Sequence, residues 1–151
     1  MGAALSRLYL DACCIIYLIE AANPFHSAMV SRLVHHGVDP ASRLITSRLS
    51  LLECRVRPVR DNDTALLAAY DAFFNADRLI AAGLSAEVVE RATRLRAIHG
   101  FSSPDALHLG TAIEMRADTF LTGDGILARC TDVAVEVLRP AQGVDEPAAH
   151  E

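Results

Sequence analysis

Four acidic residues stand out because each occurs in or close to an apolar segment of the sequence. They are Asp11, Glu53, Asp105 and Asp124. Asp11 ends the segment RLYLD, and Glu53 lies within the largely apolar segment RLSLLECRV. A charge on an apolar face needs a partner or a metal ion, because an unpaired buried charge is costly. We therefore treat the four carboxylates as candidate ligands of a shared metal site.

The chemistry that such a site supports follows from the oxygen ligands. Mg²⁺ and Mn²⁺ are hard ions that prefer oxygen, and sites acting on phosphodiesters hold them with a few carboxylates and several waters. A bound cation lowers the pKa of a water so that it can attack, and a second cation can stabilise the leaving oxygen. No protein nucleophile is then required. The residue types therefore predict metal-dependent hydrolysis of a phosphodiester.

Each acid taken alone also has an ordinary structural explanation. An acid in the first turn of a helix, as expected for Asp105, stabilises the helix by about 0.3–1 kcal/mol. Asp124 stands between two glycines and could be a turn residue. Asp11 and Glu53 are harder to explain in this way, because their segments are apolar. The occurrence of all four in one chain favours a functional site.

Length and composition predict one globular domain. The chain has 151 residues, of which 52% are hydrophobic and 5% aromatic, and its mean hydropathy is +0.25. The longest apolar run, residues 12–19, is too short to span a membrane. Arg7 and Asp11 interrupt the segment where an export signal would be apolar, so we expect a cytoplasmic protein without a membrane partner.

The charge and the cysteines exclude several classes of protein. The net charge of −5 argues against binding nucleic acid through bulk positive charge, although bound divalent cations would reverse the local sign. All 14 basic residues are Arg, which excludes mechanisms that require Lys. The cysteines have neither a zinc-site nor a disulfide-scaffold spacing, so we expect reduced and mostly buried thiols. They are Cys13, Cys14, Cys54 and Cys130.

Hydrophobic periodicity predicts alternating strands and helices. The expected strands are residues 7–11, 43–46, 78–81, 119–122 and 133–138. The expected helices are residues 13–23, 25–36, 48–57, 61–75, 85–99 and 103–116. This alternation predicts a three-layer α/β/α fold with a central, mainly parallel sheet, in a single domain of residues 1–140 followed by a flexible tail of residues 141–151.

Local signals predict where these helices begin and end. Ser47, Ser85 and Ser103 are the expected N-caps, the last with Pro104 in the first helical turn. Gly37 is the expected left-handed residue at a helix end, Gly100 is expected to terminate its helix, and Pro58 is expected to close its helix. Val88 and Val89 are expected on the buried side of their helix.

The predicted fold suggests where the acids would meet. In parallel α/β sheets the functional crevice lies beyond the carboxyl ends of the strands. Asp11 and Asp124 follow expected strands and fall there directly. Glu53 and Asp105 lie on helices from which they could converge on the same place.

Four segments together resemble a known family. YLDACCIIYLIE, TSRLSLLECRV, SSPDALHLGTAI and FLTGDGIL are similar to the four acidic motifs of PIN-domain proteins, especially the VapC toxins of bacterial toxin-antitoxin pairs. The resemblance covers about residues 8–138 and implies a PIN-like α/β/α fold. It also implies a Mg²⁺- or Mn²⁺-dependent endoribonuclease that forms a homodimer and is neutralised by a cognate antitoxin protein.

The resemblance assigns a role to each acid. Asp11 would be the central metal ligand, and Glu53 and Asp105 would share the metal or its waters. Asp124 would be the fourth acid, acting through water. Thr122 matches a hydroxyl residue that commonly precedes this acid by two positions and could orient water or phosphate.

The sequence departs from the family pattern at two positions. Cys13 stands where similar proteins usually carry Ser or Thr, so a softer atom and weaker hydrogen-bond donor lies next to the site. Gly125 stands where a basic side chain is frequent, which removes one expected contact with RNA.

The remaining polar residues near these motifs are expected to be structural or solvated. Glu20 is interpreted as a solvent-facing helix end rather than a fifth acid, and His108 as a satisfied core or interface residue. His35 and His36 are interpreted as surface residues. The Arg residues could contact RNA phosphates or an acidic partner, with solvated surface as the simpler interpretation. They are Arg48, Arg55, Arg57, Arg60, Arg91, Arg94 and Arg96.

Other functions of this fold class lack their motifs. A receiver domain and a dehalogenase-type phosphatase both use a Lys, and the sequence has none. Neither a P-loop nor a GxGxxG motif is present, so nucleotide binding has no supporting motif. The alternative that stays open is a catalytically inactive PIN-like module that binds protein or RNA.

Overall fold

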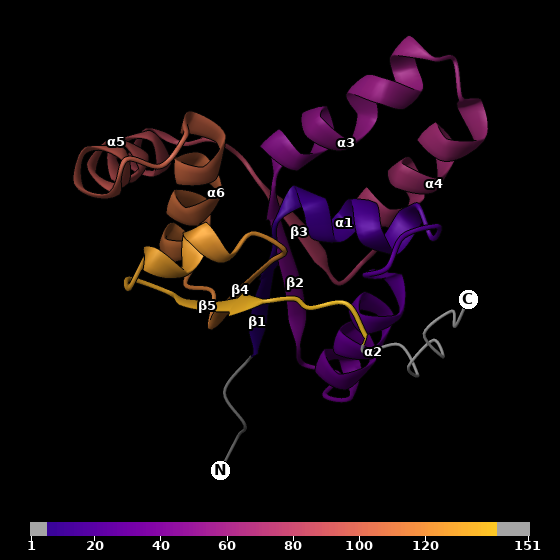
Figure 1. Cartoon of the computed structure of the whole chain (residues 1–151), viewed down its shortest axis with the longest axis horizontal. Coiled ribbons are helices and arrows are strands. Elements are labelled where there is room, and N and C mark those ends of the chain that lie inside the picture. Colours follow the sequence, from indigo (N-terminus) through magenta and orange to yellow (C-terminus); the bar gives the residue numbers. More distant parts are fainter. Residues whose placement is uncertain (1–5, 142–151) are drawn as a thin grey trace, which may run out of the picture.

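A five-stranded parallel sheet forms the centre of the computed structural model, which describes residues 6–141 (Figure 1). Its strands are β1 (Arg7–Leu10), β2 (Arg43–Ser47), β3 (Leu79–Ala82), β4 (Thr119–Thr122) and β5 (Ala134–Val137). Their order in the sheet is β3-β2-β1-β4-β5, and every neighbouring pair is parallel. The predicted parallel sheet is confirmed.

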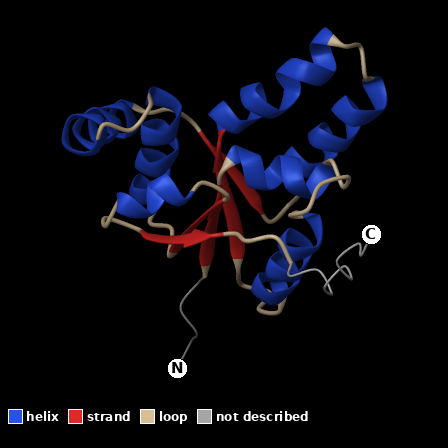
Figure 2. Cartoon of the chain, in the orientation of Figure 1, coloured by secondary structure: helices blue, strands red, loops and turns tan. Residues whose placement is uncertain are grey.

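Helices cover both faces of this sheet (Figure 2). They are α1 (Ala12–Ile19), α2 (His26–Gly37), α3 (Arg48–Arg60), α4 (Thr64–Phe74), α5 (Ala86–His99), α6 (Ser103–Glu114) and the 3₁₀ helix η1 (Gly125–Arg129). In Figure 1, α5, α6 and η1 lie on one side, and α1 to α4 lie on the other. The three-layer α/β/α architecture is therefore as predicted.

The strand order determines which loops become neighbours. From β1 the chain goes to β2 and β3 on one side of the sheet, and later returns to β4 on the other side. The carboxyl ends of β1 and β4 therefore adjoin, and the backbone N–H of Asp11 donates to the carbonyl of Leu121 at 3.0 Å. Such a reversal of strand order is where α/β sheets place their binding crevice.

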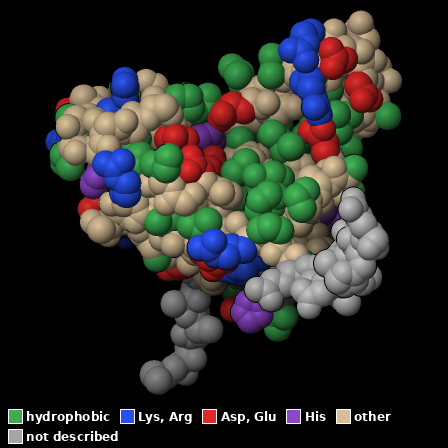
Figure 3. Space-filling view, in the orientation of Figure 1, with side chains coloured by type: hydrophobic (Ala, Val, Ile, Leu, Met, Phe, Trp, Pro, Cys, Tyr) green, Lys and Arg blue, Asp and Glu red, His purple; other side chains and the backbone are tan. Residues whose placement is uncertain are grey.

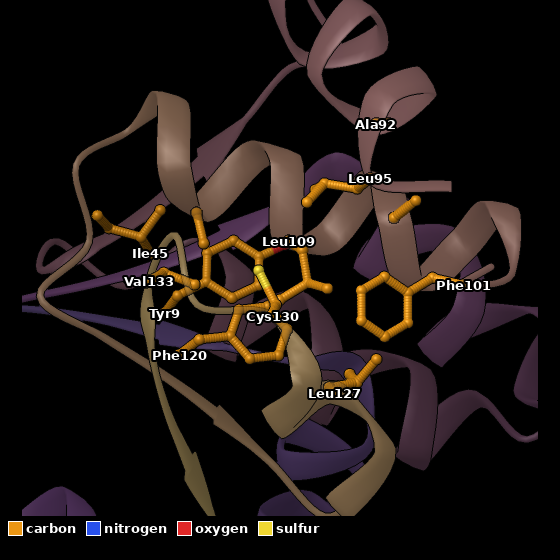
Figure 4. Close-up of a cluster of buried hydrophobic side chains, with 12 residues drawn as sticks. Tyr9, Ile45, Ala92, Leu95, Phe101, Leu109, Phe120, Leu127, Cys130 and Val133 are labelled. Carbon is orange, nitrogen blue, oxygen red and sulfur yellow. The ribbon is translucent and has the colours of Figure 1, made fainter. Parts of the chain in front are cut away.

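Alternation along β1 divides the core into two clusters. Tyr9 packs among side chains of α5, α6 and η1, where its ring stacks on Phe120 with 5.0 Å between centroids (Figure 4). Leu8 and Leu10 point to the opposite face and pack with α1, α2 and α4. A strand buried on both faces has no solvated side, which explains the nearly continuous apolar sequence of β1.

The predicted boundaries of α3 and α6 are wrong. Helix α3 continues through Pro58 to Arg60 and ends where Asn62 adopts a positive φ of 52°. The missing N–H of Pro58 removes one bond in the last turns, but the Asp61 and Asp63 N–H groups still bond to carbonyls of this segment. The N-cap of α6 is Ser102 rather than Ser103, because the Ser102 hydroxyl accepts from the Asp105 N–H.

Three further expectations are corrected by the packing. Val89 is 48% exposed, because only Val88 of this pair faces the core. His36 is buried and its Nε2 lies 2.9 Å from the carbonyl oxygen of Arg43, so it is not a surface residue. Gly37 is the last residue of α2 and does not have the left-handed conformation that we expected. Among the described glycines, the positive φ is at Gly100 (72°).

Helix α1 is shorter than expected and ends at Ile19. The side-chain amide of Asn23 donates to the carbonyl oxygens of Tyr17 and Glu20. The Tyr17 carbonyl would have accepted from Ala21 in a longer helix, and the Glu20 carbonyl has no helical donor because Pro24 lacks an N–H, so the Asn23 amide satisfies both as the chain turns.

Within residues 6–141 no helix is long and apolar enough to cross a membrane. The predicted tail of residues 141–151 lies, apart from residue 141, outside the described residues.

Helices α5 and α6 pack closely at Gly110, which gives a test of the fold. A Cβ atom at this position would lie 3.1 Å from the backbone oxygen of Val88. We expect Gly110→Val to lower the free energy of unfolding by about 1–3 kcal/mol, as other overpacking substitutions do. Gly83→Val is the matched control, because a Cβ there meets nothing within 4 Å. Equal urea midpoints for the two variants would contradict this close approach.

Candidate metal centre

Asp11 lies at the centre of the site, at the junction of β1 and α1. Its carboxylate is buried, and two donors fix its orientation. Oδ1 accepts from the backbone N–H of Ala12 at 2.9 Å, and Oδ2 accepts from the Thr122 hydroxyl at 2.7 Å. Asp11 is also the N-cap of α1, so the local structure and the site both use this carboxylate.

Thr122 connects the loop after β1 with the loop after β4. Its buried hydroxyl donates to Asp11 and accepts from the Asp124 backbone N–H at 3.1 Å. Asp124 begins η1, and its Oδ1 accepts from the Ile126 N–H at 3.0 Å. Asp124 is exposed, with its second carboxylate oxygen available to solvent or a ligand.

Glu53 reaches the site from α3 through a contact that the sequence did not reveal. Its Oε1 lies 2.6 Å from Nε2 of His108, a residue only 1% exposed. The same Nε2 lies 3.8 Å from Oδ1 of Asp11, and His108 Nδ1 lies 2.7 Å from the Tyr9 hydroxyl. His108 is the satisfied core residue that we expected, but it also joins two of the four acids. The available signal was its position three residues after Asp105, on the same side of a helix.

Asp105 lies in the first turn of α6 and is half-buried. Burial raises the pKa of its carboxyl, and the negative charges of Asp11 and Asp124 raise it further. The hydrogen bond with Ser102 and the nearby His108 act in the opposite direction. Asp105 therefore shares one electrostatic environment with the other acids, although it makes no hydrogen bond to them. Figure 3 shows acidic side chains gathered beside a histidine on this face of the molecule.

The four acids are not brought together equally. Asp11 and Glu53 both lie next to the imidazole of His108. Asp105 and Asp124 interact with this region only electrostatically. Within residues 6–141, no three His, Cys, Asp or Glu side chains converge closely enough to hold a metal ion. The donor set nevertheless consists of carboxylate oxygens, which fits a hard divalent cation. Burial and, to a smaller extent, the charges of Asp11 and Asp124 raise the pKa of Asp105, and a bound cation would favour its ionised form.

Comparison with known families adds to this geometry. A sequence model of the PIN domain matches residues 8–132, which cover all four acids. The chain belongs to the PIN domain family. No curated protein matches the chain.

Solved structures with the same fold as this PIN domain include toxin-antitoxin proteins. VapBC2 from Rickettsia felis, bound to a promoter DNA fragment, matches with a TM-score of 0.70 and 17% identity over 88% of this chain and 99% of that chain. DNA-bound VapBC from Salmonella typhimurium gives 0.72 and 15% over 89% and 100%. VapC20 from Mycobacterium tuberculosis, a sarcin-ricin loop cleaving toxin, gives 0.65 and 18% over 81% and 93%.

Cys13 of the PIN domain lies beside Asp11. Its Sγ is 3.7 Å from Oδ2 of Asp11 and 4.0 Å from the Thr122 hydroxyl oxygen, and it accepts from the Gly123 N–H at 3.4 Å. The predicted position of Cys13 next to the site is therefore observed. All four cysteines are free thiols, and the other three are buried, as predicted.

Glu20 of the PIN domain is not the solvent-facing helix end that we expected. Its carboxylate accepts hydrogen bonds from Arg57 of α3 and Tyr70 of α4, and 26% of its side chain is exposed. Burial raises the pKa of Tyr70 to about 12, so this phenol remains a donor. These contacts attach the α3–α4 hairpin, which carries Glu53, to α1.

Several arginines that we considered as contacts for RNA or a partner, with solvated surface as the simpler interpretation, are paired within the PIN domain. Arg55 pairs with Asp71 at 3.4 Å, and Arg60 with Asp61 at 3.1 Å. On α5, Arg91 pairs with Glu114 at 2.6 Å. Exposed pairs of this kind contribute little stability, and a phosphate could still compete for the guanidinium groups.

The raised pKa of Asp105, caused first by burial and then by neighbouring negative charges, predicts a stabilising substitution. Because the folded-state pKa is raised, the folded chain binds this proton more tightly than the unfolded chain, and stability falls as pH rises through the folded-state value. Asp105→Asn removes the charge. We expect a rise in Tm of about 1–2 °C at pH 7, small because the group is screened by solvent. The rise should disappear near pH 3, about one unit below the ordinary pKa of Asp.

Calorimetry in the presence of EDTA measures this difference. Asp77→Asn, at an exposed acid in the turn before β3, is the control. A Tm for Asp105→Asn that stays at or below the parent at pH 7 would contradict the net cost of ionising Asp105 in the folded chain.

Proposed function

We propose that this PIN domain is a Mg²⁺- or Mn²⁺-dependent endoribonuclease and the toxin of a toxin-antitoxin pair. The observation that supports the proposal most directly is the buried Asp11 carboxylate, which two donors hold in place while Glu53 approaches through His108. The negative charges of Asp105 and Asp124 act on the same region. Carboxylates that act on one region repel one another, and a bound divalent cation, of the kind that serves phosphodiester hydrolysis, would relieve this repulsion.

In this proposal Asp11, Glu53, Asp105 and Asp124 hold the cation. When bound, the cation supplies an activated water and neutralises charge on the phosphate. The Thr122 hydroxyl and the Ala12 N–H keep both oxygens of Asp11 in a fixed orientation. Because Thr122 also accepts from the Asp124 N–H, it keeps the loop of the fourth acid next to the first.

The RNA substrate and the antitoxin partner are parts of the same proposal. Structures similar to this fold include VapBC and FitAB complexes, and one similar protein is a toxin that cleaves the sarcin-ricin loop. We extend to this chain an RNA substrate, a cognate antitoxin that covers the acidic site, assembly as a homodimer and a cytoplasmic location. The net charge of −5 supports recognition of RNA through a metal-filled site rather than through bulk positive charge.

One observation favours a second candidate function. No three candidate ligands within the described residues converge closely enough to hold a metal ion. A PIN-like module that binds RNA or protein without cutting would need no such convergence. Stable binding of RNA in EDTA, together with no cleavage in Mg²⁺ or Mn²⁺, would favour this alternative.

Substitution of the central acid tests the nuclease proposal. We expect Asp11→Asn to lower the rate of RNA cleavage by more than about 100-fold, beyond the loss typical of residues that only support ligands. Asparagine keeps one oxygen that can accept from the Ala12 N–H, and its amide group can donate to the Thr122 hydroxyl oxygen, so the fold should be retained. The rate is measured by gel electrophoresis with Mg²⁺ or Mn²⁺, on protein freed of any antitoxin.

Two controls make this result specific. Asp77→Asn should cleave at the parental rate, and EDTA should abolish cleavage by the parent. Circular dichroism should show equal helix content for Asp11→Asn and the parent. A folded Asp11→Asn protein that cleaves at an undiminished rate would refute the assignment.

A further inference from the structure

Three side chains in mutual contact extend from the core to the candidate metal centre. The Tyr9 hydroxyl on β1 lies 2.7 Å from Nδ1 of His108 on α6, and His108 Nε2 lies 2.6 Å from Oε1 of Glu53 on α3. Tyr9 is fully buried and His108 is 1% exposed, whereas 32% of the Glu53 side chain is exposed. This row of contacts therefore begins at the buried residues Tyr9 and His108 and ends at Glu53, whose side chain reaches solvent.

The direction of these hydrogen bonds follows from the groups involved. An ionised carboxylate has no hydrogen, so the bond between His108 and Glu53 requires a hydrogen on Nε2. In the neutral ring Nδ1 then accepts, and the phenol of Tyr9 donates to it. Burial raises the pKa of Tyr9 well above its usual value, which keeps the phenol protonated and able to donate.

Glu53 depends on its single hydrogen bond with His108 more than Asp11 depends on either of its own. Within residues 6–141, His108 donates the hydrogen bond that its carboxylate accepts, and Oε2 has no protein partner. Asp11, in contrast, accepts hydrogen bonds on both carboxylate oxygens, from the Ala12 N–H and from the Thr122 hydroxyl. Glu53 has a longer side chain on a helix hairpin that projects from the sheet (Figure 1), so more rotamer freedom must be removed to place it.

We propose that Tyr9 and His108 are positioning residues for Glu53. Tyr9 fixes the imidazole ring, and the Nε2–H of His108 holds Oε1 of Glu53 beside Asp11, which leaves Oε2 for a divalent cation. This inference rests on the proposed metal site and adds two residues outside the four acids. The comparable arrangement in metalloproteins, a partner that orients a ligating group, changes metal affinity about 10–100-fold when it is removed.

A matched pair of substitutions separates the two hydrogen bonds of His108. The amide nitrogen of Gln lies at the distance of Nε2 from the backbone, and the amide nitrogen of Asn at the distance of Nδ1. His108→Gln therefore keeps the donor to Glu53, whereas His108→Asn reaches only the side of Tyr9. If His108 merely filled a buried space, both variants would lose stability and neither would change the affinity for metal selectively.

The readout is the binding of Mn²⁺ to the full chain, measured by isothermal titration calorimetry without RNA. We expect His108→Asn to raise the Kd for Mn²⁺ about 10–100-fold. His108→Gln should restore affinity to within about threefold of the parent, a difference below 1 kcal/mol. Tyr9→Phe, which keeps the ring stacked on Phe120 but removes the hydroxyl, should give an intermediate loss and serves if His108→Asn does not fold.

A double substitution tests whether the effect passes through Glu53. In a Glu53→Ala background the acceptor of the His108 hydrogen bond is absent, so His108→Asn should cause no further change in Mn²⁺ affinity. Additive losses would overturn the positioning role. Long-range ¹H–¹⁵N spectra of the metal-free protein provide an independent readout. They should show a hydrogen on His108 Nε2 whose signal shifts in Glu53→Gln, and an Nε2 without hydrogen would also overturn it.

The outcomes distinguish this inference from the function on which it rests. If the parent protein binds no Mn²⁺, the proposed metal site fails and the positioning role fails with it. If the parent binds Mn²⁺ and folded His108→Asn or Tyr9→Phe binds it within twofold of the parent, the positioning role alone is wrong. Weak binding by His108→Asn together with recovery in His108→Gln supports both.

Discussion

The hydrogen bond between the Thr122 hydroxyl and the Asp11 carboxylate joins the two strand ends on which the site depends. It exists because β1 and β4 are neighbours, although 111 residues separate the two side chains along the chain. The same carboxylate begins α1 by accepting from Ala12, so the fold needs Asp11 as a helix cap. One side chain therefore serves local structure and the candidate chemistry at once.

The site combines well-satisfied hydrogen bonds with unfavourable charge. Buried side-chain polar atoms among the described residues all have partners, so the hydrogen bonds around Asp11 and His108 are complete. The charges are not balanced in this way, since burial and the negative charges of Asp11 and Asp124 raise the pKa of Asp105. A protein selected for stability alone would replace such an acid, and its presence is consistent with selection for a bound cation.

Most elements were predictable because their signals are local. Strand β4, the caps of α3 and α5, and the end of α5 at Gly100 depend on periodicity and on side chains within a few residues. The errors arose where packing outweighed these signals. Helix α3 passes through Pro58 because the residues after it still find hydrogen-bond partners, and His36 is buried because β2 offers it a carbonyl group.

The sequence by itself determined the family and the fold class and singled out the four acids as candidate ligands, because these depend on residue types in a fixed order along the chain. Only the tertiary structure decided how each acid is held. The contact between His108 and Glu53 joins residues 55 positions apart, and the contact of Glu20 with Arg57 and Tyr70 joins two helices to a third. Such pairings depend on the order of strands and the crossing of helices, which local periodicity does not specify.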